Sequence, residues 1–245
     1  VQIKMADKNT TTTAEQPDVV IKAKGFWDKY SKPIIYVGSA IILLIGGWYA
    51  YQNFIVAPKE KKASELIFPA ENLFDKMASA NFNKDSVNIV LNGGSLEGNK
   101  VTGLLSIISG YGGTKSGNRA KFMTGASYLQ INEYDKAIKY LKDFDGKGAD
   151  QVQSKAYILL GHAYAEKKST DEALSYYKKA ATVNSKDESI TPYALLMAAS
   201  YADATGKSKE AIDLYKELKE KFPTNTAVVS GDVEKHLARL GEFSK

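Results

Sequence analysis

Cysteine is absent from the 245 residues, and histidine occurs only twice. Without cysteine the chain has no disulfide framework, no thiol nucleophile and no thiolate metal site. The two isolated histidines, His162 and His236, offer little support for a metal site of another kind. We interpret His162 as a polar residue lining a groove and His236 as an exposed helical residue. The sequence therefore predicts no metal and no cofactor.

Clusters of basic residues are also missing, although the formal net charge is +5. Lysines alternate with acidic residues in runs such as KELKEK, a pattern typical of solvated helical surfaces. A protein that binds nucleic acid needs basic residues gathered on one face. The composition therefore argues against a nucleic-acid partner, and nothing in it indicates a small-molecule substrate.

A catalytic constellation is lacking as well. The stretch GYGGTKSG, residues 110–117, has the glycine content of a phosphate-binding loop. The required order of glycine, lysine and serine or threonine is not present, and no parallel-strand unit surrounds it. We interpret this segment as a connecting loop, and we expect no enzymatic activity.

One long run of the chain carries no charge. Residues 34–56 are 23 residues without Asp, Glu, Lys or Arg. As a helix this run would extend about 34 Å, enough to cross a hydrocarbon core of about 30 Å. Aromatic residues gather near both ends, where they suit the headgroup region. The sequence predicts a membrane anchor that includes Ile34, Trp48, Tyr49 and Val56.

The anchor is expected to be retained. A cleavable signal peptide has a shorter apolar region and small residues at the −3 and −1 positions of its cleavage site. Ala50 is preceded at −3 by Trp48, and Ala57 by Ile55 with Pro58 following. Lysines flank both ends in equal number, so the positive-inside rule does not decide the orientation. We favour a cytoplasmic N-terminus because a short tail with four lysines is easily retained there.

Three segments after the anchor share the spacing of tetratricopeptide repeats. The matching positions in the middle segment are Tyr157, Leu160, Gly161, Tyr164, Ala173, Tyr177 and Ala180. Those of the preceding segment are Gly125, Tyr128, Ala137 and Leu141. Those of the last segment are Ala199, Ala202, Ala211 and Tyr215, with Pro223 at its end. The sequence predicts three pairs of helices, each with a first helix A and a second helix B.

Small residues at one position of each A helix predict a close crossing of the pair. Gly125, Gly161 and Ala199 hold this position, where a larger side chain would keep the two backbones apart. We expect the alanines of the B helices to fit against them.

Capping helices are expected at both ends of the stack, because each repeat leaves an apolar face for a neighbour. A helical stripe predicts the C-terminal cap, formed by Val229, Val233, Leu237 and Leu240. On the other side, an apolar pattern around Pro69 predicts a helix that this proline kinks or divides. Residues 104–108 are expected to form a short apolar helix.

The predicted fold is all-α, with a single transmembrane helix followed by a solenoid of about three repeats. We divide it into a disordered cytosolic tail (1–24), a juxtamembrane segment with the transmembrane helix (25–57), an N-terminal helical cap (58–117), tetratricopeptide repeats (118–223) and a C-terminal capping helix (224–245).

The A helices are expected to line a concave groove for a partner. The predicted groove residues are Arg119, Phe122, Ala126, Leu129, Gln130, Lys155, Ile158, His162, Glu166, Tyr193, Leu196, Ser200 and Asp203. Tetratricopeptide proteins that bind chaperone tails place lysine and asparagine there, whereas the central position here holds Phe122, Ile158 or Leu196. Such a groove suits an apolar or amphipathic segment. The chain's own C-terminal helix is an equally good occupant.

Taken together, these features resemble the YfgM family, the tetratricopeptide ancillary subunit of the SecYEG translocon. The resemblance covers Trp27 to Pro223 and rests on GGWY at the end of the span, on ASELIFPAENLFDKM and on GNRAKFMTGASYLQINEYDKAIKYL. Loops such as VLNGGSLEGNK are similar to the version found in Bacteroidota. The resemblance implies an inner-membrane protein with a periplasmic helical domain, which associates with SecYEG and a PpiD-like membrane-anchored chaperone and assists emerging secretory polypeptides.

Two other functions remain open. The chain could be a scaffold of another cell-envelope assembly or secretion machine, with the groove holding a fixed partner. It could also be a non-catalytic accessory subunit of a membrane enzyme complex. The sequence does not identify the partner, its surface or the oligomeric state.

Overall fold

A computed structural model describes residues 18–80, 82–96 and 98–242. The chain divides into two compact units, Val1–Val56 and Ala57–Lys245.

The first unit is helical wherever the structure describes it. Helix α1 spans Asp18–Tyr51, and a π-helix follows at Gln52–Val56. The helical stretch Lys22–Ser79 contains an 18-residue window of mean hydropathy 1.7, none of it buried. Leu44, for example, is 73% exposed. By length and composition this stretch is compatible with a single membrane span.

The predicted disordered tail does not extend as far as residue 24. Residues 1–17 lie outside the described residues, but residues 18–24 belong to helix α1. The prediction of a tail through residue 24 was therefore wrong at its end. Helix α1 extends N-terminally past the apolar run because residues 18–24 contain no proline or glycine that would stop it.

Helix α2 opens the second unit at Ala57–Ser79 and is not divided by Pro69. Its buried face packs on α4 and α5 and is formed by Ala63, Ile67, Ala70, Leu73 and Met77. This packing offsets the hydrogen bond that proline cannot donate inside a helix. Of the two effects predicted for Pro69, a kink or a division of the helix, the division was therefore wrong.

The cap also contains elements that the sequence did not predict. Helix α3 spans Lys84–Asn92, and the strands β1 (Gly94–Leu96) and β2 (Asn99–Val101) form an antiparallel hairpin. Helix α4 follows at Leu104–Tyr111, as expected. Gly103 precedes it, and a Cβ at this position would lie 2.3 Å from the backbone carbon of Asn92. The described strands lie in the cap, so the repeats keep the predicted all-α architecture.

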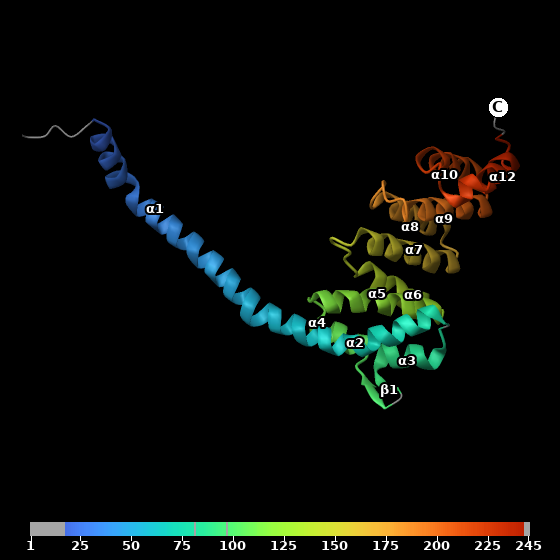
Figure 1. Cartoon of the computed structure of the whole chain (residues 1–245), viewed down its shortest axis with the longest axis horizontal. Coiled ribbons are helices and arrows are strands. Elements are labelled where there is room, and N and C mark those ends of the chain that lie inside the picture. The colour runs from blue at the N-terminus through green and yellow to red at the C-terminus, as the bar shows by residue number, and fades with distance from the viewer. Residues whose placement is uncertain (1–17, 81, 97, 243–245) are drawn as a thin grey trace, which may run out of the picture. The chain divides into compact units, whose positions relative to one another are not determined.

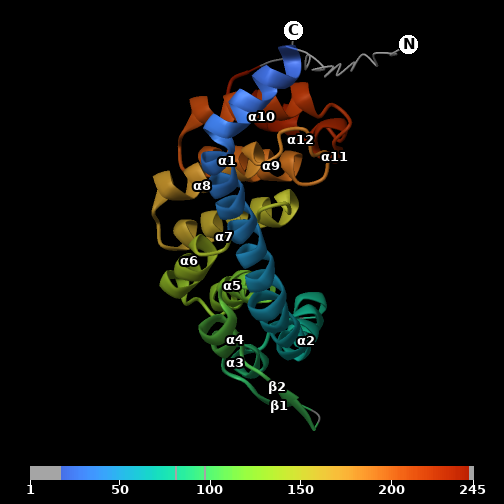
Figure 2. The same ribbon diagram turned by 90° about the vertical axis from the view of Figure 1, so that its left-hand side faces the viewer.

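Three antiparallel helix pairs form the repeat stack, as Figures 1 and 2 show in green to orange. The A and B helices of the first repeat are α5 (Lys115–Gln130) and α6 (Tyr134–Lys142). Those of the second are α7 (Asp150–Glu166) and α8 (Thr170–Thr182). Those of the third are α9 (Thr191–Ala204) and α10 (Ser208–Lys221). Each pair buries its apolar faces internally and against the next pair.

The C-terminal cap consists of two short helices, α11 (Thr226–Val229) and α12 (Asp232–Arg239). Gly231 between them has a left-handed backbone with φ +77°, which ends the continuous helix that the apolar stripe predicted. Val233 and Leu237 are buried against the third repeat, but Val229 is 72% exposed. The expectation that Val229 belongs to the same buried stripe was therefore wrong.

Candidate functional site

The close crossings within the first two repeats occur at the predicted glycines. A Cβ at Gly125 would lie 2.5 Å from Cγ of Leu141, and one at Gly161 would lie 2.4 Å from Cε1 of Tyr177. The closest side chain of the B helix is therefore a large residue, four positions after the alanine that we expected there. The missing side chain makes room for a leucine or a tyrosine across the pair.

A cleft with a largely apolar lining lies between α2, α5 and the start of the second repeat. This cavity, called the α2–α5 cleft below, has a volume of about 530 Å³. It is lined by Glu71, Phe74, Asp75, Lys115, Asn118, Arg119, Phe122, Met123, Phe144, Asp145, Gly146, Lys147, Ala149 and Val152. Two predicted groove residues, Arg119 and Phe122, are among them.

Aromatic side chains form one wall of the α2–α5 cleft. The rings of Phe122 and Phe144 lie 5.4 Å apart and are inclined at 54°. Phe74, from α2, makes an edge contact with Phe82 at 5.6 Å. Phe144 is buried, whereas Phe74 and Phe122 are half-buried and present part of their rings to the cavity. Apolar side chains of a ligand that pack on this wall would be removed from water, which stabilises binding by about 25 cal/mol per Å² of apolar area buried.

Charged groups rim the same cleft. Nε of Arg119 donates to Oε1 of Glu71 at 2.8 Å, so the predicted groove arginine is held by α2. Among the described residues, the Asp75 carboxylate and the Lys115 ammonium form no ion pair. The cleft thus combines an apolar wall with charges of both signs, which suits an amphipathic polypeptide.

The glycine-rich segment before α5 is already occupied by an anion from the chain itself. The Glu60 carboxylate accepts hydrogen bonds from the backbone N–H of Lys115 at 2.6 Å and of Ser116 at 3.0 Å. The Ser116 hydroxyl donates to it at 2.8 Å. A helix N-terminus favours negative charge, and here a carboxylate of α2 takes the place that a phosphate would need.

The surroundings of Glu60 change its acidity. Partial burial by itself raises the pKa, but the hydrogen bonds from Ser116 and from the backbone of Lys115, with the nearby Arg119 charge, outweigh this effect. The pKa of Glu60 therefore lies below its ordinary value. The ionised form is the one that links α2 to α5.

The groove residues predicted in the second repeat do not form one exposed surface. Ile158 is only 4% exposed and belongs to the core, whereas Lys155 and Glu166 are exposed. His162 is half-buried, and its Nδ1 lies 2.8 Å from the Tyr177 hydroxyl. Burial lowers the pKa of His162, against a smaller raising effect of Glu166. Ile158 therefore contributes to packing, and its expected place on an exposed groove was wrong.

Tyr177 completes this interior contact. Burial is the main cause that raises the pKa of its hydroxyl, with further contributions from the neighbouring Tyr201, Tyr193 and Glu166. The hydroxyl therefore remains protonated and is able to donate to His162. We attribute to this pair a role in packing α7 on α8.

The remaining groove predictions fall on surfaces of different character. Leu129 of the first repeat and Leu196 of the third are half-buried and pack against core clusters. Tyr193 is 46% exposed on α9. None of these three is among the residues that line the α2–α5 cleft.

Asp203 of the third repeat is engaged by the chain's own C-terminal cap. Its carboxylate forms an ion pair with Arg239 of α12 and lies 3.4 Å from Nδ1 of His236. The His236 ring stacks on Tyr215 at 5.0 Å. The alternative that α12 covers predicted groove residues therefore applies to Asp203. The interpretation of His236 as a plain exposed residue was wrong, because its ring is a packing contact.

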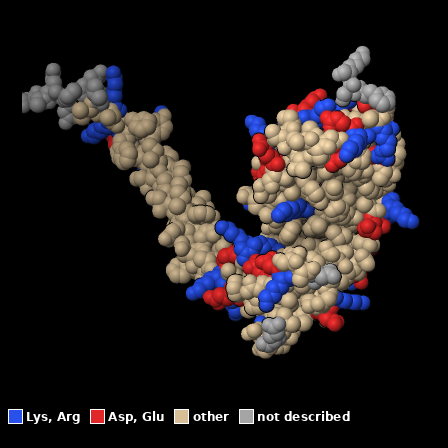
Figure 3. Space-filling view, turned by 45° about the vertical axis from the view of Figure 1, so that its right-hand side comes forward, with Lys and Arg blue, Asp and Glu red and all other residues tan. Residues whose placement is uncertain are grey.

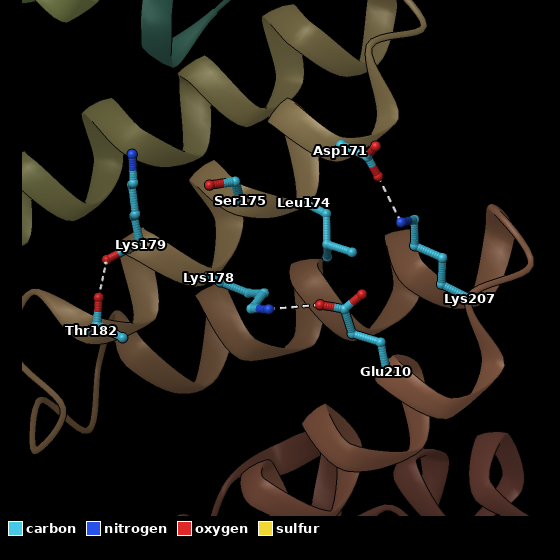
Figure 4. Close-up of a pocket in the computed structure, with 8 residues that line it drawn as sticks. All are labelled: Asp171, Leu174, Ser175, Lys178, Lys179, Thr182, Lys207 and Glu210. Carbon is cyan, nitrogen blue, oxygen red and sulfur yellow. Dashed lines mark hydrogen bonds and ion pairs between the residues drawn. The ribbon is translucent and has the colours of Figure 1, made fainter.

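A second cavity, of about 380 Å³, lies on the B helices α8 and α10. Figure 4 shows two ion pairs in it, Lys178 with Glu210 at 2.6 Å and Lys207 with Asp171 at 2.7 Å, in which Lys179 takes no part. More widely, Figure 3 shows basic and acidic side chains interspersed over the visible face of the second unit. No cluster of three or more metal-ligating side chains occurs among the residues described.

Comparison with known proteins agrees with the repeat architecture. A family model described as a tetratricopeptide repeat-like domain matches residues 24–184, about two thirds of the chain and including the apolar run. A second model, described as a tetratricopeptide repeat, matches residues 193–225. No curated protein matches the chain. Tetratricopeptide repeats are typically non-catalytic scaffolds for protein partners. The chain belongs to the tetratricopeptide repeat-like domain family.

Proposed function

We propose that this protein is a membrane-anchored adaptor that holds polypeptide segments in the α2–α5 cleft while they emerge from the SecYEG translocon. The helical domain lies in the periplasm and the N-terminus in the cytoplasm. The protein performs no chemistry of its own and acts by binding. A PpiD-like chaperone is a further partner.

The observation that carries the proposal is the apolar wall of the α2–α5 cleft. Phe122 and Phe74 remain half-buried although they lie beside a well-packed core. Emerging secretory chains expose apolar side chains that are not yet folded, and a partly covered aromatic surface is suited to them. The charged rim, with Asp75 and Lys115 unpaired among the described residues, gives contacts for polar neighbours of such a side chain.

The position of the cleft in the chain supports action at a membrane. Helix α2, which supplies Glu71, Phe74 and Asp75, begins directly after the apolar run. The family match starts at residue 24, so the apolar run is included in what the chain shares with its family. The translocon as the partner rests on the resemblance of GGWY and the following helical segments to the YfgM family.

Photocrosslinking from within the cleft tests the proposal. A photoreactive phenylalanine analogue at position 122 in the full chain is expected to crosslink in living cells to many secretory polypeptides and to the translocon channel. Lys209 is exposed on α10 and makes no described contact, so the same analogue there is the matched control. Crosslinks that occur at position 122 and not at 209 would support the cleft as the binding site.

The possible outcomes separate the candidate functions. One stable envelope protein as the sole product would favour a scaffold of another assembly machine over the translocon. Equal crosslinking at positions 122 and 209 would refute the cleft as the site. Orientation is tested independently, because protease added to spheroplasts should degrade the helical domain if it is periplasmic.

A further inference from the structure

A separate pocket lies between the first and second repeats. It has a volume of about 300 Å³ and is called the α6–α8 pocket below. Its lining residues are Leu141, Lys142, Phe144, Asp145, Gln153, Tyr157, Leu160, Tyr176 and Lys179. The proposed function does not use this pocket, although Phe144 and Asp145 also line the α2–α5 cleft.

Two lysines converge on one aromatic ring at this pocket. The Nζ atom of Lys179 lies 4.7 Å from the ring centroid of Tyr176, and that of Lys142 lies 5.9 Å from it. Lys142 also lies 5.3 Å from the ring of Tyr164, which stacks on Tyr176 at 5.4 Å. The electron-rich faces of the tyrosine rings attract both ammonium groups.

Neither lysine is neutralised by a carboxylate within the described residues. Figure 4 makes the contrast visible, since Lys178 and Lys207 reach Glu210 and Asp171 while Lys179 points away from them. The carboxylate that lines the pocket and could balance this charge is itself paired with another lysine.

Asp145 is that group. It is the one carboxylate among the lining residues of the α6–α8 pocket. It pairs with Nζ of Lys147 at 3.4 Å and accepts a hydrogen bond from the backbone N–H of Lys147 at 3.1 Å. The two convergent lysines therefore leave the pocket with a net positive charge.

The charge of Lys142 is stable over the whole physiological range. Its interaction with the Tyr164 hydroxyl is the main cause that raises the pKa of Lys142, against a smaller lowering by burial. Leu141 and Leu160 lie beneath the pocket and are each 1% exposed, so the lysines and tyrosines are the groups that a ligand can reach. The lining therefore combines two lysine side chains with aromatic rings.

We propose that the α6–α8 pocket binds an acidic segment of a partner protein, whose carboxylates contact Lys142 and Lys179. Charge complementarity selects carboxylates for this pocket. A run of acidic residues in a protein segment supplies a carboxylate to each lysine. Lys142 and Lys179 do not line the α2–α5 cleft, so their replacement should leave binding at that cleft intact.

Fluorescence anisotropy with the full chain in neutral detergent tests this pocket. The probe is a short fluorescein-labelled peptide of alternating Glu and Leu, and its counterpart carries Gln in place of Glu. We expect the acidic peptide to bind and the Gln peptide not to bind. In the double variant K142Q/K179Q the affinity for the acidic peptide should fall about tenfold, because two charge contacts are lost.

Lys178→Gln is the matched control, because it removes one lysine of the same helix that is already paired with Glu210. It should change the affinity less than twofold, a bound set by the small effect of an exposed charge. Equal losses in K178Q and K142Q/K179Q, or equal binding of the Gln peptide, would overturn the proposal. The proposal would also be overturned if a short-chain phosphatidylglycerol bound through Lys142 and Lys179 and the peptide did not. The pocket would then be a lipid site. The circular dichroism melting curve of each variant checks that the exposed substitutions leave the fold intact.

Discussion

In each of the three repeats, one residue with positive φ lies between the A helix and the B helix. These residues are Asn132 (φ 64°), Lys168 (φ 60°) and Gly206 (φ 77°). In every case the next backbone N–H bonds back to the A helix, as Ser169 N–H does to the Tyr164 carbonyl at 2.9 Å. Glycine adopts this left-handed backbone without strain, whereas lysine does so at a cost of about 1 kcal/mol.

Replacing Lys168 by glycine should therefore stabilise the second repeat. We expect Lys168→Gly to raise the free energy of unfolding by about 0.5–1 kcal/mol, because the steric cost of positive φ disappears. Chemical denaturation of the full chain in neutral detergent measures it. The reverse change, Gly206→Lys, is the control and should lower stability. A decrease in both variants would show that the Lys168 side chain makes a contribution that outweighs its backbone strain.

At Gly161, in contrast, the glycine itself is needed, and a larger residue should destabilise the fold. An added Cβ would lie 2.4 Å from Tyr177, so Gly161→Ala should destabilise the chain by about 1–3 kcal/mol through overpacking at the α7–α8 crossing. Thermal unfolding followed by circular dichroism measures the loss. Gly110 in α4 has open space around its Cβ position, so Gly110→Ala is the control and should be neutral or slightly stabilising. An unchanged melting temperature in Gly161→Ala would mean that Tyr177 moves away without cost.

At the scale of elements, the link between α2 and α5 depends on one carboxylate. Glu60 lies in the first turn of α2, and its hydrogen bonds reach the first turn of α5, 55 residues further along the chain. Thr114 caps the same helix by accepting from Gly117 N–H at 2.9 Å. The first repeat is thus joined to the helix that follows the apolar run by a charged contact as well as by apolar packing.

Glu60→Gln should weaken this link in a pH-dependent manner. Because the folded-state pKa of Glu60 lies below its ordinary value, its stabilising effect is complete above the ordinary pKa and is lost as the pH falls through the folded-state pKa. At neutral pH the variant should be less stable by about 1 kcal/mol, the usual effect of a helix cap.

The pH series gives the decisive comparison. Below the folded-state pKa the carboxylate is protonated in both states, so wild type and Glu60→Gln should become nearly equal in stability. Urea denaturation at neutral and acidic pH measures both differences. A stability gap that stays constant over the whole range would mean that the charge of Glu60 does not contribute to the link.

The sequence predicted the elements of the repeats better than those of the cap. The regular spacing of the alanines located α5 to α10, because the same packing requirement produces the same residue pattern in three successive helix pairs. Helix α3 and the hairpin were missed, since VLNGGSLEGNK reads as a loop of glycine and polar residues. A hairpin of three-residue strands has little local signal, and it forms where β2 packs on α2.

At the scale of the whole molecule, the apolar run determines whether the chain is tied to a membrane. An arginine at the centre of a transmembrane helix costs about 2.5–3.5 kcal/mol on insertion scales, and two should abolish stable insertion. We expect the wild type to remain in the membrane pellet after carbonate extraction and the variant L43R/L44R to appear in the supernatant. L43A/L44A keeps the run uncharged and is the control. Release of wild-type protein by carbonate would contradict the anchor.

Local patterns in the sequence determined the uncharged run, the number and phase of the helix pairs and the glycine crossings, because each depends on residues within one or two helices. The tertiary structure alone decided which predicted groove residues are accessible. It buries Ile158, engages Asp203 with α12 and brings Phe122 to a cleft with α2. It also placed Lys142 and Lys179 on one tyrosine ring. These contacts join separate helices, and the distance between helices is set by packing of the whole core, which no single segment encodes.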